Sequence, residues 1–211
     1  MNLKTFFSEQ ARKPSGLFGR FVMPRIFDLG NIVLNDLMKD SLAAKENDHV
    51  LEIGFGTGKF ISEIAKTIGT GSIEGIDLSK TMMEIAIRKN QQNIAQGRVI
   101  LKHGDFDTAD YDNDSFDVIC SANTIYFWPN EDSSVNKIFR ILKPGGKLVL
   151  AFEDIDQLRS RHLNTTIFNF FSVEKIKKLL IGNGFSNGVD IFTREVKSQK
   201  YHCAVSIKDK I

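Results

Sequence analysis

The sequence predicts an α/β fold: a doubly wound, mostly parallel, seven-stranded sheet with helices on both faces. Three observations support this prediction. Short apolar runs alternate with segments of helical periodicity, which is the order of repeated β–α–β units. The runs are continuously apolar, as expected of strands that helices cover on both sides. Sixteen glycines and four prolines in 211 residues fit one domain of strands with tight connections.

The expected elements follow one another along the chain. Residues 1–44 are expected to form an N-terminal flap and an amphipathic helix, because apolar side chains recur at helical intervals from Arg25 to Ala44. Residues 45–211 are expected to form the main domain, with a substrate-cover insertion near 153–171. The predicted strands are 49–54, 72–77, 98–103, 115–122, 147–152, 188–195 and 200–208, and the predicted helices between them are 57–68, 79–95, 133–142 and 172–184.

Composition excludes several classes of protein. With 28 basic and 26 acidic side chains, the chain lacks the basic footprint of a nucleic-acid binder. Cys120 and Cys203 lie far apart without metal-ligand spacing, so we expect no metal site, no disulfide and a cytoplasmic location. No apolar run is long enough to span a membrane. Residues 1–27 interleave phenylalanines with basic residues, so peripheral membrane contact and a flap over the site both stay open.

The segment Val50–Phe60, "VLEIGFGTGKF", is the first candidate site. Gly54, Gly56 and Gly58 stand between a strand and a helix, where glycines let a ligand approach the backbone near a helix N-terminus. No register places a third glycine where the dinucleotide fingerprint needs it. The spacing is instead E-x-G-x-G-x-G, which begins at Glu52.

Three further motifs follow in order: "IEGIDLSKTMM" with Asp77, "HGDF" with Asp105 and Phe106, and "KPGG" before the fifth strand. Together with the glycine segment they cover about residues 45–153. Over this range the sequence resembles the class I (Rossmann-like) S-adenosylmethionine-dependent methyltransferases, and in particular their small-molecule branch. The resemblance implies a seven-stranded sheet whose last strand is antiparallel.

The resemblance also implies a cofactor and the residues that hold it. The cofactor is S-adenosyl-L-methionine, and the product is S-adenosyl-L-homocysteine. The glycine segment and Glu52 are expected at its amino-acid end, Asp77 at the ribose hydroxyls, and Asp105 at the adenine amine. Met82 either flanks the adenine or belongs to the helix core. The expected cofactor-binding residues are Glu52, Gly54, Gly56, Gly58, Asp77, Leu78, Met82, Asp105, Phe106 and Asn123.

The methyl acceptor is expected beyond the fourth strand, at "SANTIYFWPN" (121–130). Asn123 and Tyr126 are spaced as in the Asn/Asp-Pro-Pro-Tyr motif of amine methyltransferases, but the two prolines are absent. Tyr126 and His162 are the predicted substrate contacts, and no catalytic residue or metal ligand is assigned. Four arginines could pair with an acidic group of the acceptor: Arg12, Arg20, Arg159 and Arg161.

The predicted function is methyl transfer from S-adenosylmethionine to a small, apolar or aromatic molecule. Such a transfer is an in-line displacement, so the protein mainly supplies position. Seventeen phenylalanines, many in the N-terminal segment and the insertion, favour an apolar acceptor. Two alternatives stay open: a methyltransferase that acts on a protein or nucleic acid, and a cofactor-binding partner subunit without catalysis. The oligomeric state also stays open.

Overall fold

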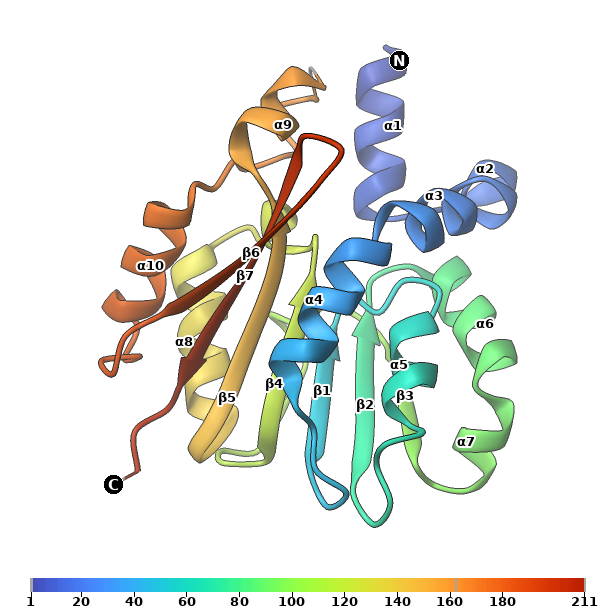
Figure 1. Cartoon of the computed structure of the whole chain (residues 1–211). Helices are drawn as coiled ribbons and strands as arrows, with labels where there is room; N and C mark the ends of the chain where they lie inside the picture. Colours follow the sequence, from blue (N-terminus) through green and yellow to red (C-terminus); the bar gives the residue numbers. More distant parts are fainter. Residues whose placement is uncertain (1, 162, 211) are drawn as a thin grey trace.

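The computed structural model describes residues 2–161 and 163–210. One seven-stranded sheet, in the order β3-β2-β1-β4-β5-β7-β6, forms its centre (Figure 1). The pairs among β1 to β5 are parallel, and β7 is antiparallel to both of its neighbours. The predicted fold class is therefore confirmed, including the antiparallel last strand. The strands are β1 (His49–Ile53), β2 (Ser72–Asp77), β3 (Val99–His103), β4 (Phe116–Ala122), β5 (Leu142–Glu153), β6 (Asp190–Val196) and β7 (Gln199–Ile207).

Helices cover both faces of this sheet (Figure 1). Successive residues of a strand point to opposite faces, and here each face meets an apolar core. Leu51 of β1 belongs to one core, whereas its neighbour Val50 belongs to the other. This arrangement explains why the strands are apolar without interruption. The helices are α1 (Leu3–Arg12), α2 (Gly16–Phe21), α3 (Met23–Gly30), α4 (Ile32–Leu42), α5 (Lys59–Ile64), α6 (Lys80–Lys89), α7 (Gln91–Ala95), α8 (Glu131–Ile141), α9 (Ile155–Ser160) and α10 (Val173–Gly182).

Two predicted helices are divided in the structure. The helix expected over 25–44 is interrupted at Asn31, where α3 ends and α4 begins. The helix expected over 79–95 is interrupted at Asn90, whose side-chain amide donates to the carbonyls of Gly58 and Ala86, both at 3.0 Å. Periodicity did not reveal these interruptions, because a single polar residue leaves the spacing of apolar residues almost unchanged.

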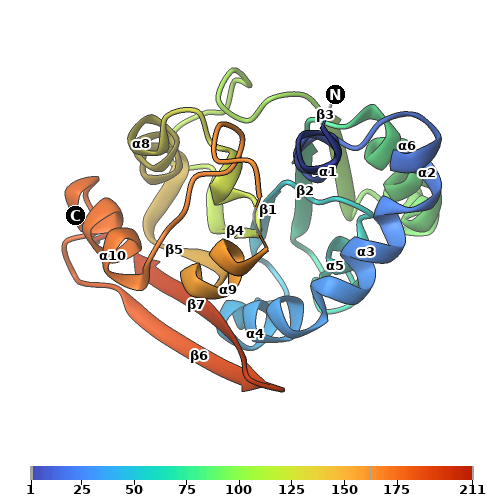
Figure 2. The ribbon, with the colours of Figure 1, turned by 90° about the horizontal axis from the view of Figure 1, so that it is seen from above.

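The N-terminal helices and the segment after β5 lie beyond the carboxyl ends of the parallel strands (Figure 1). Seen from above, α1, α3 and α9 surround this end of the sheet (Figure 2). Asn164 joins the two covers: its backbone N–H donates to Ser8 Oγ at 3.3 Å, and its side-chain amide donates to Thr5 Oγ1 at 3.0 Å. Within the described ranges, no helix is long and apolar enough to cross a membrane.

Candidate functional site

A cavity of about 440 Å³ lies between the sheet and these covers. Its walls come from the glycine segment after β1, the ends of β2 and β4, the N-terminal helices, and α9 with the loop that follows it. The carboxyl ends of neighbouring parallel strands are where open α/β sheets bind their ligands. The cavity is therefore the candidate site.

The three glycines of the first motif have different surroundings, although all have positive φ. A Cβ on Gly54 would lie 2.3 Å from Thr124 Cγ2, and one on Gly58 would lie 2.7 Å from Ala86 Cβ. A Cβ on Gly56 would meet only Phe27, at 3.6 Å. Gly54 and Gly56 line the cavity, whereas Gly58 packs against α6. The structure thus gives Gly58 a packing role against α6 and Gly54 a close contact with Thr124, and only Gly56 leaves open space beside its backbone.

Two acids, Glu52 and Asp77, line the same part of the cavity. Asp77 Oδ2 accepts from Gly56 N at 2.8 Å, and its Oδ1 accepts from Ser79 N at 2.7 Å. Burial raises the pKa of Asp77 to about 6, although the two amides act in the opposite direction. Asp77 therefore shapes the glycine loop and still faces the cavity.

Glu52 differs from Asp77 in one respect: its buried Oε2 has no hydrogen-bond partner. Burial, with the charges of Asp77 and Glu63 adding to it, raises the pKa of Glu52 to about 8. A buried acceptor without a donor is costly unless a ligand supplies that donor. The two acids fit a ligand that carries a positive charge and several donor groups.

The residues expected at the adenine also line the cavity: Leu78, Met82, Asp105 and Phe106. Met82 is fully buried, so it is at once a core residue of α6 and a wall of the site. One oxygen of Asp105, Oδ1, accepts from Asp107 N at 3.0 Å. Its other oxygen makes no such bond within this loop, which agrees with the predicted contact to an amine donor.

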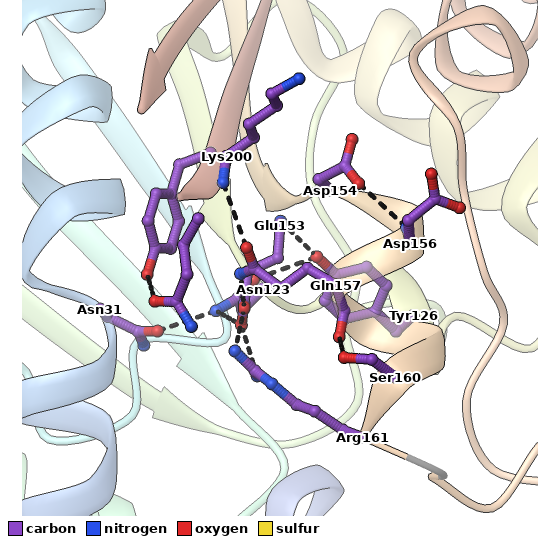
Figure 3. A network of polar contacts seen from close by, with 12 residues as sticks. Asn31, Asn123, Tyr126, Glu153, Asp154, Asp156, Gln157, Ser160, Arg161 and Lys200 are labelled. Carbon is purple, nitrogen blue, oxygen red and sulfur yellow. Dashed lines mark hydrogen bonds and ion pairs between the residues drawn. The ribbon is translucent and has the colours of Figure 1, made fainter. Parts of the chain in front are cut away.

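The segment after β4 forms a polar network at the other end of the cavity (Figure 3). Asn123 has a positive φ of 57°, and its Nδ2 donates to Asn31 Oδ1 at 2.8 Å and to Glu153 Oε1 at 3.4 Å. The Tyr126 hydroxyl donates to Asn123 Oδ1 at 3.1 Å and accepts from Glu153 N at 2.6 Å. Asn31 at the α3–α4 interruption is thereby connected to β4 and β5.

Tyr126, the predicted substrate contact, is only 2% exposed, and its hydroxyl is already bonded within this network. Burial, with the Glu153 carboxylate adding to it, raises its pKa well above the usual range. It lines the cavity as part of the wall, so any contact with an acceptor would be made by its ring. His162, the other predicted contact, lies outside the described residues.

Glu153, which follows the last apolar residue of β5, is a site residue that the motifs did not reveal. Arg161 donates to both of its oxygens, Nη1 to Oε1 at 3.0 Å and Nη2 to Oε2 at 2.5 Å, and Gln157 Nε2 donates to Oε2 at 2.6 Å (Figure 3). Glu153 and Arg161 both line the cavity. The sequence could have indicated Glu153 as a site residue, because it follows an apolar run that ends at the carboxyl edge of the parallel sheet.

Three of the four arginines proposed for an acidic acceptor have partners within the chain. Arg161 pairs with Glu153, Arg20 with Glu84 at 3.0 Å, and Arg159 with Asp156 at 4.0 Å. These three would each have to leave a carboxylate before pairing with an acceptor, whereas Arg12 lines the cavity and stays a candidate for that pairing. The remaining walls are largely apolar and come from α1, α3, the β4–α8 segment and the second cover: Phe7, Ala11, Met23, Ile26, Phe27, Leu29, Trp128, Leu158, Leu163 and Phe168.

A comparison with protein families identifies this arrangement. A family model described as "Methyltransferase domain" matches residues 50–146, which include the glycine segment, Asp77, Asp105 and the β4–α8 segment. This match and the order of the strands support a class I S-adenosylmethionine-dependent methyltransferase. The matched region contains the sheet edge at which the cavity lies.

Individual relatives agree with this assignment. The chain is 26% identical over 178 residues to the uncharacterized methyltransferase YdaC of Bacillus subtilis, an alignment that covers 84% of this chain and 93% of that protein. It is 27% identical over 173 residues to a demethylmenaquinone methyltransferase of Lactobacillus johnsonii, covering 69% and 71%. A phosphoethanolamine N-methyltransferase of Haemonchus contortus has the same fold, with a TM-score of 0.79 at 16% identity over 100% of this chain and 61% of that one.

The residues present fit the cofactor of this methyltransferase family. The orphaned oxygen of Glu52 and the carboxylate of Asp77 provide acceptors for an ammonium group and for hydroxyls, and Gly56 leaves its backbone open to the cavity. Leu78 and Phe106 offer apolar surface for a purine ring. Among the residues that the structure describes, no cluster of three or more histidines, cysteines or acids could hold a metal ion.

Proposed function

We propose that this chain is an S-adenosylmethionine-dependent methyltransferase whose acceptor is a small, apolar or aromatic molecule. One observation carries the proposal. A single cavity extends from the acids Glu52 and Asp77 to an apolar chamber between α1, α3 and the second cover. A charged cofactor and an apolar acceptor would therefore have adjoining places. The name of the Lactobacillus johnsonii relative, demethylmenaquinone methyltransferase, supports an acceptor of this class.

The roles of the residues follow from their positions. The cofactor supplies a methyl group that is already activated by a sulfonium, so no strong base is needed to make the carbon reactive. Asp77 and Asp105 would orient the nucleoside, and Glu52 would accept from the ammonium group. Asn123, which the sequence predicted at the cofactor, and Glu153 would shape the cavity wall through their hydrogen bond to each other. Phe27, Trp128 and Phe168 would exclude water from it.

The test is transfer of a labelled methyl group from S-adenosylmethionine to acceptors of three classes. These are a short-chain demethylated naphthoquinol, phosphoethanolamine, and a mixture of protein and RNA. We expect label in the naphthoquinol class and none in the macromolecules. Transfer only to protein or RNA, or no transfer despite measured cofactor binding, would overturn the proposal. The second outcome would favour a cofactor-binding partner subunit.

A matched pair of variants shows whether transfer occurs at this site. Asp77→Asn removes one carboxylate oxygen from the cavity and should abolish most of the transfer at limiting cofactor. Asp112→Asn changes an exposed acid in the loop before β4 and should leave transfer unchanged. Equal losses in the two variants would place the chemistry elsewhere.

A further inference from the structure

The outer surface of α2 and α3 exposes an unusual number of large apolar side chains. Among the described residues, seven of the thirteen large hydrophobic side chains that are exposed lie within residues 1–32. Leu17 is 77% exposed, Phe21 60% and Leu29 72%. α2 and α3 lie at the outer rim of the N-terminal cover (Figure 2). We call this surface the α2–α3 face; its apolar residues are Leu17, Phe21, Val22, Ile26 and Leu29.

Basic side chains accompany this apolar surface. Residues 1–32 carry five lysines and arginines against two acids, whereas the rest of the chain has 23 basic and 24 acidic residues. Arg25 Nη1 donates to the carbonyl of Phe21 at 3.3 Å, which holds its guanidinium next to the face. Lys13 is exposed at the end of α1. Exposed apolar side chains with basic neighbours are typical of helices that lie in a membrane interface.

The α2–α3 face is continuous with the candidate site. Ile26 and Leu29 are exposed on the face and also line the cavity. Phe27, between them in the sequence, lies beside Gly56. Ile26 and Leu29 therefore give an apolar molecule a continuous contact from the surface of α3 into the cavity.

We propose that the α2–α3 face docks on an anionic lipid bilayer, and that a lipophilic acceptor enters the cavity from that surface. A bilayer with anionic headgroups complements both the apolar residues and the positive charge of this region. A second copy of the chain is a poorer partner, since pairing two such faces would bring like charges together. Docking itself does not depend on the proposed methyl transfer; only the route of the acceptor does.

Docking is tested by co-sedimentation of the full chain with lipid vesicles, without cofactor or acceptor. One set of vesicles contains phosphatidylglycerol and phosphatidylcholine, and the other contains phosphatidylcholine alone. We expect the protein to sediment with the anionic vesicles and to be released by raised salt. Protein that stays in the supernatant with both kinds of vesicle overturns the proposal, whether or not it transfers methyl groups.

Two pairs of variants identify the surface. Leu17→Ser with Phe21→Ser should lower the affinity for anionic vesicles more than about tenfold. Neither residue lines the cavity, so the change should not act through the site. The control, Ile181→Ser with Phe192→Ser, removes exposed apolar groups from α10 and β6 and should change nothing. Lys13→Gln with Arg25→Gln should lower the affinity for anionic vesicles about fivefold for each charge removed. Lys177→Gln with Lys178→Gln on α10 is the control.

Sedimentation velocity without lipid separates docking from self-association. We expect the same oligomeric state for the native chain and for the Leu17→Ser, Phe21→Ser variant. An assembly that dissociates in the variant would make the α2–α3 face a contact between copies and overturn the proposal. Equal loss of vesicle binding in the α10 and β6 control would also contradict it.

Discussion

Asp77 combines two tasks at the scale of single residues. Its carboxylate accepts the amides of Gly56 and Ser79, and it lines the cavity beside Glu52. An ionised carboxylate has about four acceptor positions, so two bonds to backbone leave room for ligand hydroxyls. The same bonds explain why this acid is near the glycine loop before any ligand arrives.

Asp77→Asn should weaken cofactor binding by about 1–3 kcal/mol, because a charged acceptor is replaced by an amide with only one oxygen. Calorimetric titration with S-adenosylhomocysteine measures the change. Asp112→Asn, an exposed acid in the loop before β4, is the control and should titrate like the native chain. An unchanged affinity for Asp77→Asn would refute a role in holding the ribose.

The glycines provide a second prediction. Gly58→Ala should lower the free energy of unfolding by about 2–5 kcal/mol, because the added methyl meets α6 and the backbone is left-handed. Gly56→Ala has space beside Phe27 and should lose about 1–2 kcal/mol through backbone strain alone, while affecting cofactor binding more. Urea unfolding and cofactor titration of both variants measure this difference. Equal destabilisation would contradict the packing role of Gly58.

At the scale of elements, α9 depends on one buried carboxylate. Arg161 and Gln157 reach from α9 and its C-terminal end to Glu153, the last residue of β5. The same carboxylate accepts from Asn123 after β4, which in turn donates to Asn31 between α3 and α4. These contacts hold both covers to the ends of the central strands, so the shape of the acceptor end of the cavity depends on them.

Arg161→Ala should lower the free energy of unfolding by about 1–3 kcal/mol, because the buried Glu153 loses a charged donor. It should also speed amide hydrogen exchange in α9, which mass spectrometry can locate. Arg159→Ala is the matched control: its pair with Asp156 is 4.0 Å long and exposed, so we expect a change within about 0.5 kcal/mol. Similar effects of the two variants would mean that the Glu153 pair does not hold α9.

At the scale of the whole molecule, the site reduces stability in the absence of a ligand. The pKa of Glu52 is raised from 4.5 to about 8, mainly by burial. The folded state therefore binds the proton of the Glu52 carboxyl more tightly than the unfolded state does. The contribution of this protonation to the free energy of unfolding is fully present below about pH 4.5 and is lost as the pH rises through about 8. A cationic ligand favours the ionised form and therefore opposes this loss.

Unfolding of the ligand-free protein should accordingly become easier between about pH 4.5 and about pH 8, by a few kcal/mol more than in Glu52→Gln. Cofactor affinity should rise over the upper part of this range in the native chain and stay nearly flat in the variant. Denaturant titrations and calorimetry over this pH range measure both trends. A parallel pH dependence in the two proteins would show that Glu52 does not carry the effect.

The sequence by itself determined the fold class, the order of the seven strands and the helices between them, and it predicted the glycine motif as a ligand site. These depend on short-range patterns: an unbroken apolar run, a helical period, and glycines between a strand and a helix. The sequence did not predict α1, α2 and α9 as helices. Gly54, Gly56 and Asp77 could be predicted to line one cavity because strand ends place them at the same edge of a parallel sheet. The interruptions at Asn31 and Asn90 escaped prediction because a single polar residue leaves the spacing of apolar residues almost unchanged.

Only the tertiary structure decided which groups meet across long distances in the sequence. It showed that Gly58 packs against α6, that Arg161 pairs with Glu153, and that Asn123 donates a hydrogen bond to Asn31. It also left one oxygen of Glu52 buried without a donor. The physical reason is that charge pairing, burial and closure of the cavity depend on where separate elements pack, and local residue patterns carry no record of that packing.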